Sequence, residues 1–189
     1  MALTTDFLDG VSGVADRSPG PRIYLWPVEG NPAGFLTFNS FQDWKNFVVW
    51  LSVRDALPQI VRGKFEAAQK LYVLGWLDLD VLKAGEFAAL ACLELALRDR
   101  YGDKVKDRKG NIYFDRLLRY MPAHDGLKNE MLPVCLRSGG DLVGDLMERP
   151  SASVLRNRQA HADPFDSVPY SGVLEVVRDL IEYAYRRWP

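Results

Sequence analysis

Apolar side chains recur at helical spacing through most of the chain after residue 39. Phe41, Trp44, Phe47, Val48 and Leu51 form the first such face. The pattern predicts helices over residues 40–50, 58–74, about 80–101, 113–120 and 141–148, and a last helix that carries Val173, Val177, Leu180, Ile181, Ala184 and Trp188.

The predicted helices begin and end at residues suited to those positions. Ser40 can accept a hydrogen bond from an amide of the first turn, and Pro58 has no amide proton to leave unpaired there. Asp78 or Asp80 can cap the third helix, and Gly102 lies just beyond its expected end as a C-cap. That third helix is apolar nearly all round, so we expect it to be the central helix.

The N-terminal region lacks helical periodicity. Residues 1–20 contain several glycines and a proline, which predicts a loosely ordered lead-in with a single helical turn. Residues 22–28 and 34–39 are rich in aromatic and branched side chains and flank the turn-forming residues 29–33. This segment is either a β hairpin or an extended arm packed on the helices.

Prolines and glycines interrupt residues 122–150, where we expect only the helix over 141–148. Beyond it, Ser151 or Ser153 can cap the turn that leads to residues 156–161. The fold class is therefore mainly α: a bundle of four or more helices with a short N-terminal β hairpin or extended arm. A chain of 189 residues suggests one domain, with residues 1–39 as an extension and 40–189 as the helical core.

Charge and composition limit the partners and the cellular compartment that we expect for the protein. The formal net charge of -1 gives no global field that would attract a polyanion, so any nucleic-acid contact needs a local patch. Cys92 and Cys135 lie apart, without metal-ligand spacing, and are expected to be buried thiols in a reducing compartment. Residues 1–10 lack the features of a secretory signal, and charges interrupt the apolar stretch 81–97. We expect a cytoplasmic protein without a membrane span.

The sharpest chemical signal is the hexapeptide Arg156-Asn157-Arg158-Gln159-Ala160-His161. On a continuous helix Arg156 and His161 point about 140° apart, but a helix that ends near His161 lets both face one cleft. A histidine moves protons near neutral pH, and an arginine offers a permanently charged fork that matches phosphate oxygens. With Asn157 as a neutral donor and acceptor, the set suits metal-free cleavage of RNA.

The hexapeptide resembles the catalytic motif of the HEPN superfamily of all-α domains, in which an arginine and a polar residue precede a histidine. Arg156, Asn157 and His161 match that motif, and a C-terminal helix after a short loop fits the family layout. The resemblance implies an endoribonuclease of a toxin-antitoxin or antiphage system. It also implies a homodimer whose twofold brings two copies of the motif together. Other members of the family are non-catalytic modules that bind nucleotides or partner proteins.

Two acidic residues on the predicted central helix are candidate supports for the motif. Glu86 shares a stripe with leucines, where an ionised carboxylate is costly unless it is paired. One hypothesis is that Glu86 or Glu94 pairs with Arg156 or another arginine and fixes its orientation. For Glu94 we favour an exposed pair with Arg98 one turn later, and for Glu86 the sequence favours neither interpretation.

Other charged residues give weaker signals. Lys104, Lys106 and Arg158 are candidate contacts to an RNA backbone, although the charged run 104–109 is typical of a solvated loop. Two histidines without clustered cysteines or carboxylates do not form a metal pattern, so neither a metal nor another cofactor is predicted.

The sequence thus favours a metal-independent endoribonuclease with Arg156, Asn157 and His161 as catalytic residues. The expected partners are RNA and a second copy of the chain, with an antitoxin or a nucleotidyltransferase as a further candidate. The alternative is a non-catalytic HEPN-like module that binds a nucleotide or a protein. Geometry separates the two: an active site needs Arg156 and His161 exposed in one groove, whereas a buried, salt-bridged Arg156 favours a scaffold.

Overall fold

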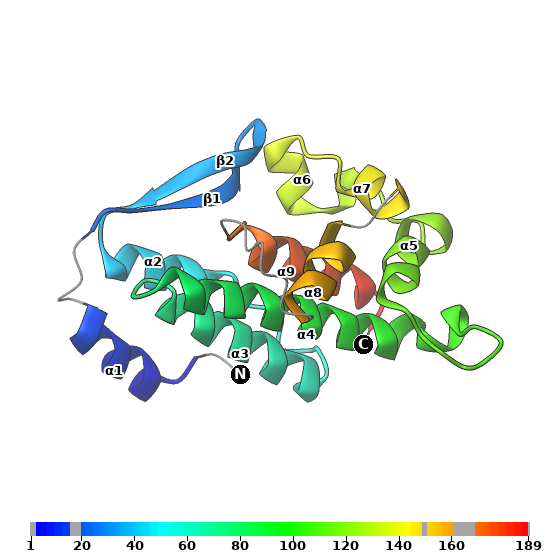
Figure 1. Cartoon of the computed structure of the whole chain (residues 1–189), viewed down its shortest axis with the longest axis horizontal. Coiled ribbons are helices and arrows are strands. Elements are labelled where there is room, and N and C mark those ends of the chain that lie inside the picture. The colour runs from blue at the N-terminus through cyan, green and yellow to red at the C-terminus, as the bar shows by residue number, and fades with distance from the viewer. Residues whose placement is uncertain (1–2, 16–19, 149–150, 161–168, 189) are drawn as a thin grey trace.

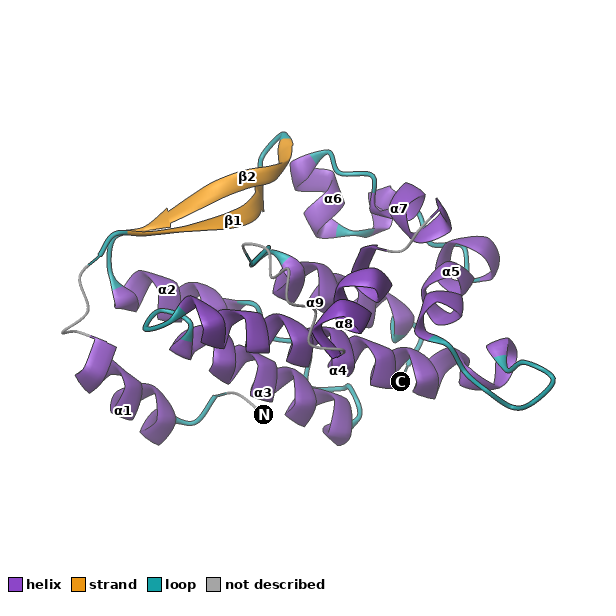
Figure 2. Cartoon of the chain, viewed as in Figure 1, coloured by secondary structure: helices purple, strands orange, loops and turns teal. Residues whose placement is uncertain are grey.

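The computed structural model describes residues 3–15, 20–148, 151–160 and 169–188. It is mainly helical with one two-stranded hairpin, which confirms the predicted fold class at this level (Figure 2). Its elements are α1 (Thr5–Ala15), β1 (Arg22–Val28), β2 (Asn31–Phe38), α2 (Phe41–Trp50), α3 (Gln59–Leu74), α4 (Leu79–Val105), α5 (Phe114–His124), the short 3-10 helix η1 (Asn129–Met131), α6 (Pro133–Ser138), α7 (Leu142–Glu148), α8 (Ser151–Ala160) and α9 (Val173–Ala184).

Helix α4 is the central helix, as its sequence predicted. It is the longest described helix, with 27 residues, and it packs against α3, α9, α5 and α8 (Figure 1). At Gly85 a Cβ atom would lie 2.8 Å from the ring of Tyr72, so α3 and α4 approach too closely there for any side chain. The core is therefore built around α4, with the leucines that the sequence placed on it buried: Leu82, Leu90, Leu93 and Leu97.

The N-terminal β segment is a hairpin rather than an extended arm. Its strands are antiparallel, with Tyr24 opposite Leu36 and one irregularity between Trp26 and Val28. The inner side chains of β1 pack on α2, where the rings of Tyr24 and Trp44 stack at 4.3 Å between centroids. Strands alternate their side chains between two faces, and on the other face of this hairpin Ile23 and Phe35 are exposed.

A buried cluster of charge ties the hairpin to the helices. Glu175 on α9 is 0% exposed and accepts a 2.7 Å hydrogen bond from the indole N–H of Trp26. Its two carboxylate oxygens also accept from Arg137 of α6 at 2.8 and 2.7 Å, and Arg137 donates to the carbonyl of Pro27 as well. With Arg178, which lies 3.4 Å from Glu175, these side chains form what we call the Glu175 cluster: Trp26, Arg137, Glu175 and Arg178.

Burial raises the pKa of Glu175, but the hydrogen bonds from Arg137 and Trp26 outweigh that effect and hold the pKa below its ordinary value. The carboxylate is thus ionised in the core, where it needs these partners.

Two of the predicted N-terminal helix caps are present, at Ser40 and Asp78. The hydroxyl of Ser40 accepts from the amide of Asp43 at 3.2 Å, and the carboxylate of Asp78 accepts from the amide of Asp80 at 2.8 Å. Both cysteines are free and buried, as expected.

The prediction of an irregular lead-in is wrong. Residues 5–15 form α1, which buries Val11 and Ala15 and packs on α2. Gly10 and Gly13 suggested a break, but both lie within the helix.

Gly102 does not cap α4, since the helix continues to Val105 and Gly102 is buried inside it. A Cβ at Gly102 would lie 3.2 Å from Ile112, so this glycine permits a close approach instead of ending the helix. Helix α5 likewise runs past Pro122 to His124.

Three further expectations are corrected in the C-terminal half. Residues 133–138 form α6, which the sequence did not predict, and Gly139 ends it in the left-handed region with φ of 71°. Ser151 and Ser153 lie within α8 and not before it. Trp188 lies beyond the end of α9, with its ring 5.7 Å from that of Tyr185.

Candidate functional site

Helix α8 places the first half of the hexapeptide against the middle of α4. A cavity of about 400 Å³ opens between α8, α4 and the segment that leads into α5. Polar side chains make up much of its lining. The described residues around this site cavity are Glu94, Arg98, Ile112, Tyr113, Phe114, Asp115, Arg119, Ser153, Val154, Arg156 and Asn157.

Glu94 holds two arginines at this cavity. One carboxylate oxygen accepts from Arg98 through Nε at 3.1 Å and Nη2 at 2.8 Å, and the other accepts from Nη2 of Arg156. The side chain of Glu94 is 9% exposed and that of Arg156 is 29% exposed. A buried carboxylate is costly without partners, so Glu94 needs these arginines. In turn, the carboxylate holds the guanidinium groups of Arg98 and Arg156 in place at the cavity.

The sequence therefore predicted the Arg98 contact of Glu94 correctly but not its burial. Arg98 is exposed as expected, at 44% of its side chain, but α8 covers the carboxylate of Glu94 and adds Arg156 as a second partner. This second contact is the pairing that the other hypothesis for Glu94 described.

Asn157 is oriented by its neighbour. The Nη1 atom of Arg156 donates to the amide oxygen of Asn157 at 2.9 Å, and the Asn157 side chain is exposed. Arg156 is therefore bonded to Glu94 on one side and to Asn157 on the other, which leaves its guanidinium in a fixed direction at the cavity.

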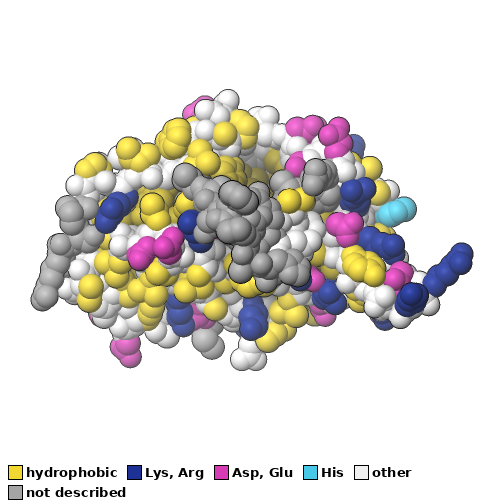
Figure 3. Space-filling view, in the orientation of Figure 1, with side chains coloured by type: hydrophobic (Ala, Val, Ile, Leu, Met, Phe, Trp, Pro, Cys, Tyr) yellow, Lys and Arg dark blue, Asp and Glu magenta, His cyan; other side chains and the backbone are white. Residues whose placement is uncertain are grey.

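Two more guanidinium groups face the same cavity. Arg98 also donates to the carbonyl of Ile112 at 3.0 Å, and Arg119 of α5 donates to the carbonyl of Glu148 at 2.9 Å. Three arginines thus line the cavity against two carboxylates, those of Glu94 and Asp115. Figure 3 shows lysine and arginine side chains gathered toward the end of the molecule where α5 lies, with acidic side chains among them.

Tyr113 adds an aromatic surface. Its side chain is exposed at the cavity, and the guanidinium of Arg116 lies 5.2 Å from the centre of its ring. Sequence reasoning missed Tyr113, Arg119 and the cavity role of Arg98. Only Arg98 carried a signal, its spacing of four residues from Glu94, because the others come from a separate part of the chain.

Several predicted site residues lie elsewhere. Glu86 is buried two turns earlier on α4, against Tyr72, whose pKa is raised chiefly by burial and further by Glu86. Lys104 lies over the ring of Tyr120 at 5.7 Å, and Lys106 pairs with Asp103. Neither lysine lines the site cavity.

The rest of the hexapeptide is outside what the structure describes. His161 lies outside the described residues, as does the side chain of Arg158. The other histidine, His124, packs on Tyr120 with the rings tilted and 5.0 Å between centroids, and it does not line the cavity.

Comparison with known proteins adds no family: no family model matches the chain, and neither a curated protein nor a solved structure matches it significantly. Among the described residues, no three His, Cys, Asp or Glu side chains gather closely enough to hold a metal ion. No helix in the described ranges is both long enough and apolar enough to cross a membrane.

Proposed function

We propose that the chain is a metal-independent endoribonuclease with an HEPN-like bundle, and that the site cavity is one side of its active site. The observation that carries this proposal is the placement of Arg156. It opens onto a cavity that also holds Arg98, Arg119 and Asn157. Guanidinium groups bind phosphate oxygens through paired N–H donors, so such a set suits the backbone of RNA.

The proposed reaction is an internal transfer at phosphorus. A base removes the proton of a ribose 2′-hydroxyl, the oxygen attacks the adjacent phosphorus, and an acid gives a proton to the leaving 5′-oxygen. The products are a 2′,3′-cyclic phosphate and a 5′-hydroxyl. Arg156 stabilises the charge on the phosphorane, and Asn157 orients the reacting groups.

His161 is the base or the acid in this proposal, on the strength of the sequence motif alone. Cleavage needs both, so we propose a homodimer that brings two His161 rings to one composite site. The enzyme would act on cytoplasmic RNA, as part of toxin-antitoxin or antiphage defence.

The test is cleavage of a labelled RNA in the presence of a chelator. We expect cyclic phosphate ends from the wild type, and a loss of at least about a hundredfold in rate for His161→Ala and for Arg156→Ala. His124→Ala and Arg187→Ala are the matched controls, since neither residue lines the cavity. If the His161 and Arg156 variants cleave as well as the wild type, the proposal is lost.

One observation favours a second candidate, a non-catalytic module that binds a nucleotide or a partner protein such as an antitoxin or a nucleotidyltransferase. Arg156 is already paired with Glu94, and only 29% of its side chain is exposed. Calorimetric titration with mononucleotides separates the two candidates. Saturable binding that Arg119→Ala weakens, without cleavage across a wide RNA panel, favours the module.

A further inference from the structure

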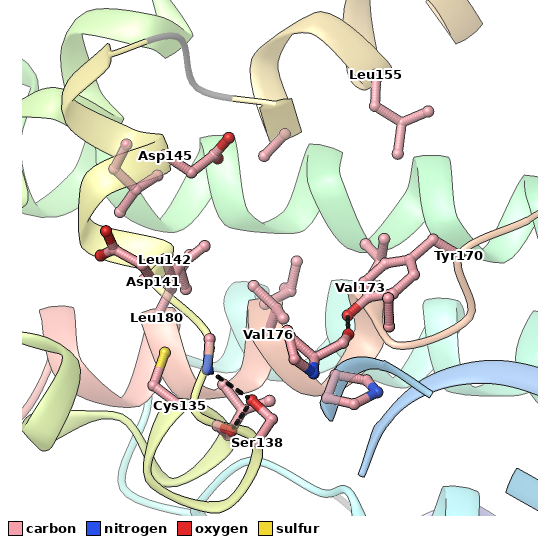
Figure 4. A pocket seen from close by; sticks show the side chains of 18 of the residues that line it. Cys135, Ser138, Asp141, Leu142, Asp145, Leu155, Tyr170, Val173, Val176 and Leu180 are labelled. Carbon is pink, nitrogen blue, oxygen red and sulfur yellow. Dashed lines mark hydrogen bonds between the residues drawn. The ribbon is translucent and has the colours of Figure 1, made fainter. Parts of the chain in front are cut away.

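A second, larger cavity lies on the other side of α8. Its volume is about 510 Å³, and it is lined by the hairpin tip, α6, α7, α8 and α9, with α4 behind it (Figure 4). Most of its lining is aliphatic. Leu93, Leu142, Leu155, Val173, Val176 and Leu180 are typical of the described residues around this apolar cavity.

The polar atoms of the wall are mostly bonded within the protein. The hydroxyl of Tyr170 donates to the carbonyl of Pro32 at 2.7 Å, and the hydroxyl of Ser138 donates to the carbonyl of Val134 at 2.7 Å. A molecule in this cavity would therefore contact mainly apolar surface, and its binding would be stabilised by burial of that surface.

The charges of the lining are of one sign. Asp141 and Asp145 lie at the end formed by α7 (Figure 4), and the described lining contains no lysine or arginine. Asp141 accepts hydrogen bonds from the amide of Gly144 and from Asn129, which hold its pKa below the ordinary value. Among the described lining residues, an anionic ligand would therefore find no lysine or arginine side chain to pair with.

We propose that this cavity binds a small organic molecule with a hydrocarbon body and no negative charge. The volume falls within the range of ligand pockets, about 300–1,000 Å³. The inference rests on the lining and the charge of the cavity, so it goes beyond the proposed ribonuclease activity and does not depend on it.

An occupant would also support the candidate active site. Ala152 and Leu155 of α8 line the apolar cavity, whereas Ser153, Arg156 and Asn157 of the same helix line the site cavity. A ligand packed against the first pair stabilises the helix that carries the second set. We therefore expect the amides of α8 to exchange more slowly when the apolar cavity is filled.

The test uses two fluorescent probes with nearly the same aromatic body. N-phenylnaphthylamine is uncharged, and anilinonaphthalene sulfonate carries a negative charge. We expect the uncharged probe to bind the full chain saturably, one to one, and at least about tenfold more tightly than the sulfonate. Hydrogen exchange on the probe-bound protein should show added protection at residues 152–157.

Variants that fill the cavity locate the site. Val176→Phe and Ala152→Leu each place extra carbon atoms in it, so each should weaken the uncharged probe at least about tenfold. Ile60→Phe is the matched control, because Ile60 is exposed on α3 and does not line the cavity. We expect this variant to bind as the wild type does.

Three results would overturn the proposal: no saturable binding to the wild type, filled variants that bind unchanged, or a preference for the sulfonate. If neither filled variant folds by circular dichroism, exchange on the wild type decides. Protection at the amides of α7, α8 and α9 supports the cavity, and protection confined to other elements overturns it. None of these measurements involves RNA, so failure here and failure of the ribonuclease proposal are distinguishable.

Discussion

Glu94 and Arg156, 62 positions apart in the chain, form an ion pair that joins α4 to α8. The same carboxylate pairs with Arg98 through its other oxygen, so one buried acid sets the direction of two guanidinium groups at the site cavity. Glu94 is thus a positioning residue for Arg156.

Glu94→Gln keeps the size of the side chain and removes its charge. We expect kcat for RNA cleavage to fall about tenfold because Arg156 loses its orientation. KM should stay equal or fall, because the cavity becomes more positive. Glu66→Gln is the control, since Glu66 is also buried and pairs with Lys70 one turn away, at 3.0 Å. An unchanged kcat in the Glu94 variant would contradict the positioning role.

The Glu175 cluster should dominate the stability of the hairpin contact. Glu175→Gln leaves Arg137 and Arg178 without their shared carboxylate, and we expect a loss of about 3 kcal/mol in the free energy of unfolding. Urea denaturation measures it. Glu182→Gln is the comparison variant: it breaks an ion pair with Arg54, and the Glu182 side chain is 30% exposed. Loss of this pair should cost less than about 1 kcal/mol. Equal losses in the two variants would argue against the cluster.

The same cluster gives the stability of the protein a pH dependence. Because the pKa of Glu175 is lower in the folded state than its ordinary 4.5, the unfolded chain binds the proton more readily. The stabilisation is complete above the unfolded pKa and is lost as the pH falls through the folded value. Asp125, whose lowered pKa reflects hydrogen bonds from Arg186 and Tyr101 that outweigh burial, adds in the same direction.

Burial raises the pKa of Asp179, which offsets part of this effect with the opposite sign. Urea midpoints measured from about pH 3 to pH 7 should therefore rise with pH, and Glu175→Gln should flatten the curve. A variant curve parallel to that of the wild type would show that Glu175 does not carry the dependence.

The glycines of α1 offer a simple gain in stability. Gly10 and Gly13 lie within the helix, and a Cβ at either would meet nothing within 4 Å. We expect Gly10→Ala and Gly13→Ala each to raise the free energy of unfolding by about 0.5–1 kcal/mol. Gly85→Ala is the contrasting variant and should be destabilising, because its Cβ would meet the ring of Tyr72. Thermal denaturation of the three variants checks the order.

The sequence predicted the long helices because their apolar spacing is repeated over several turns, as in α3 and α4. It failed where packing outweighed local composition. Gly10 and Gly13 are typical of a break, yet the contact with α2 keeps α1 helical. Helix α6 has only six residues, too few for a period to be recognised.

The candidate site was predictable only where it is local. Arg156 and Asn157 are neighbours in the sequence, and the motif placed them together before any fold was known. Arg119 and Tyr113 reach the same cavity through the packing of α5 and α8 around α4, which no local pattern encodes. Burial of Glu94 likewise depends on α8 lying over it.

The Glu175 cluster also constrains how such a chain can change over evolutionary time. One carboxylate serves the indole of Trp26, the guanidinium of Arg137 and that of Arg178, on three elements far apart in sequence. Substitution of Glu175 leaves the donors of Trp26 and Arg137 without their shared acceptor, and substitution of Arg137 removes two of the hydrogen bonds to the buried carboxylate. In related chains Trp26, Arg137 and Glu175 should therefore be retained together or replaced together, so that their covariation would trace the attachment of the hairpin.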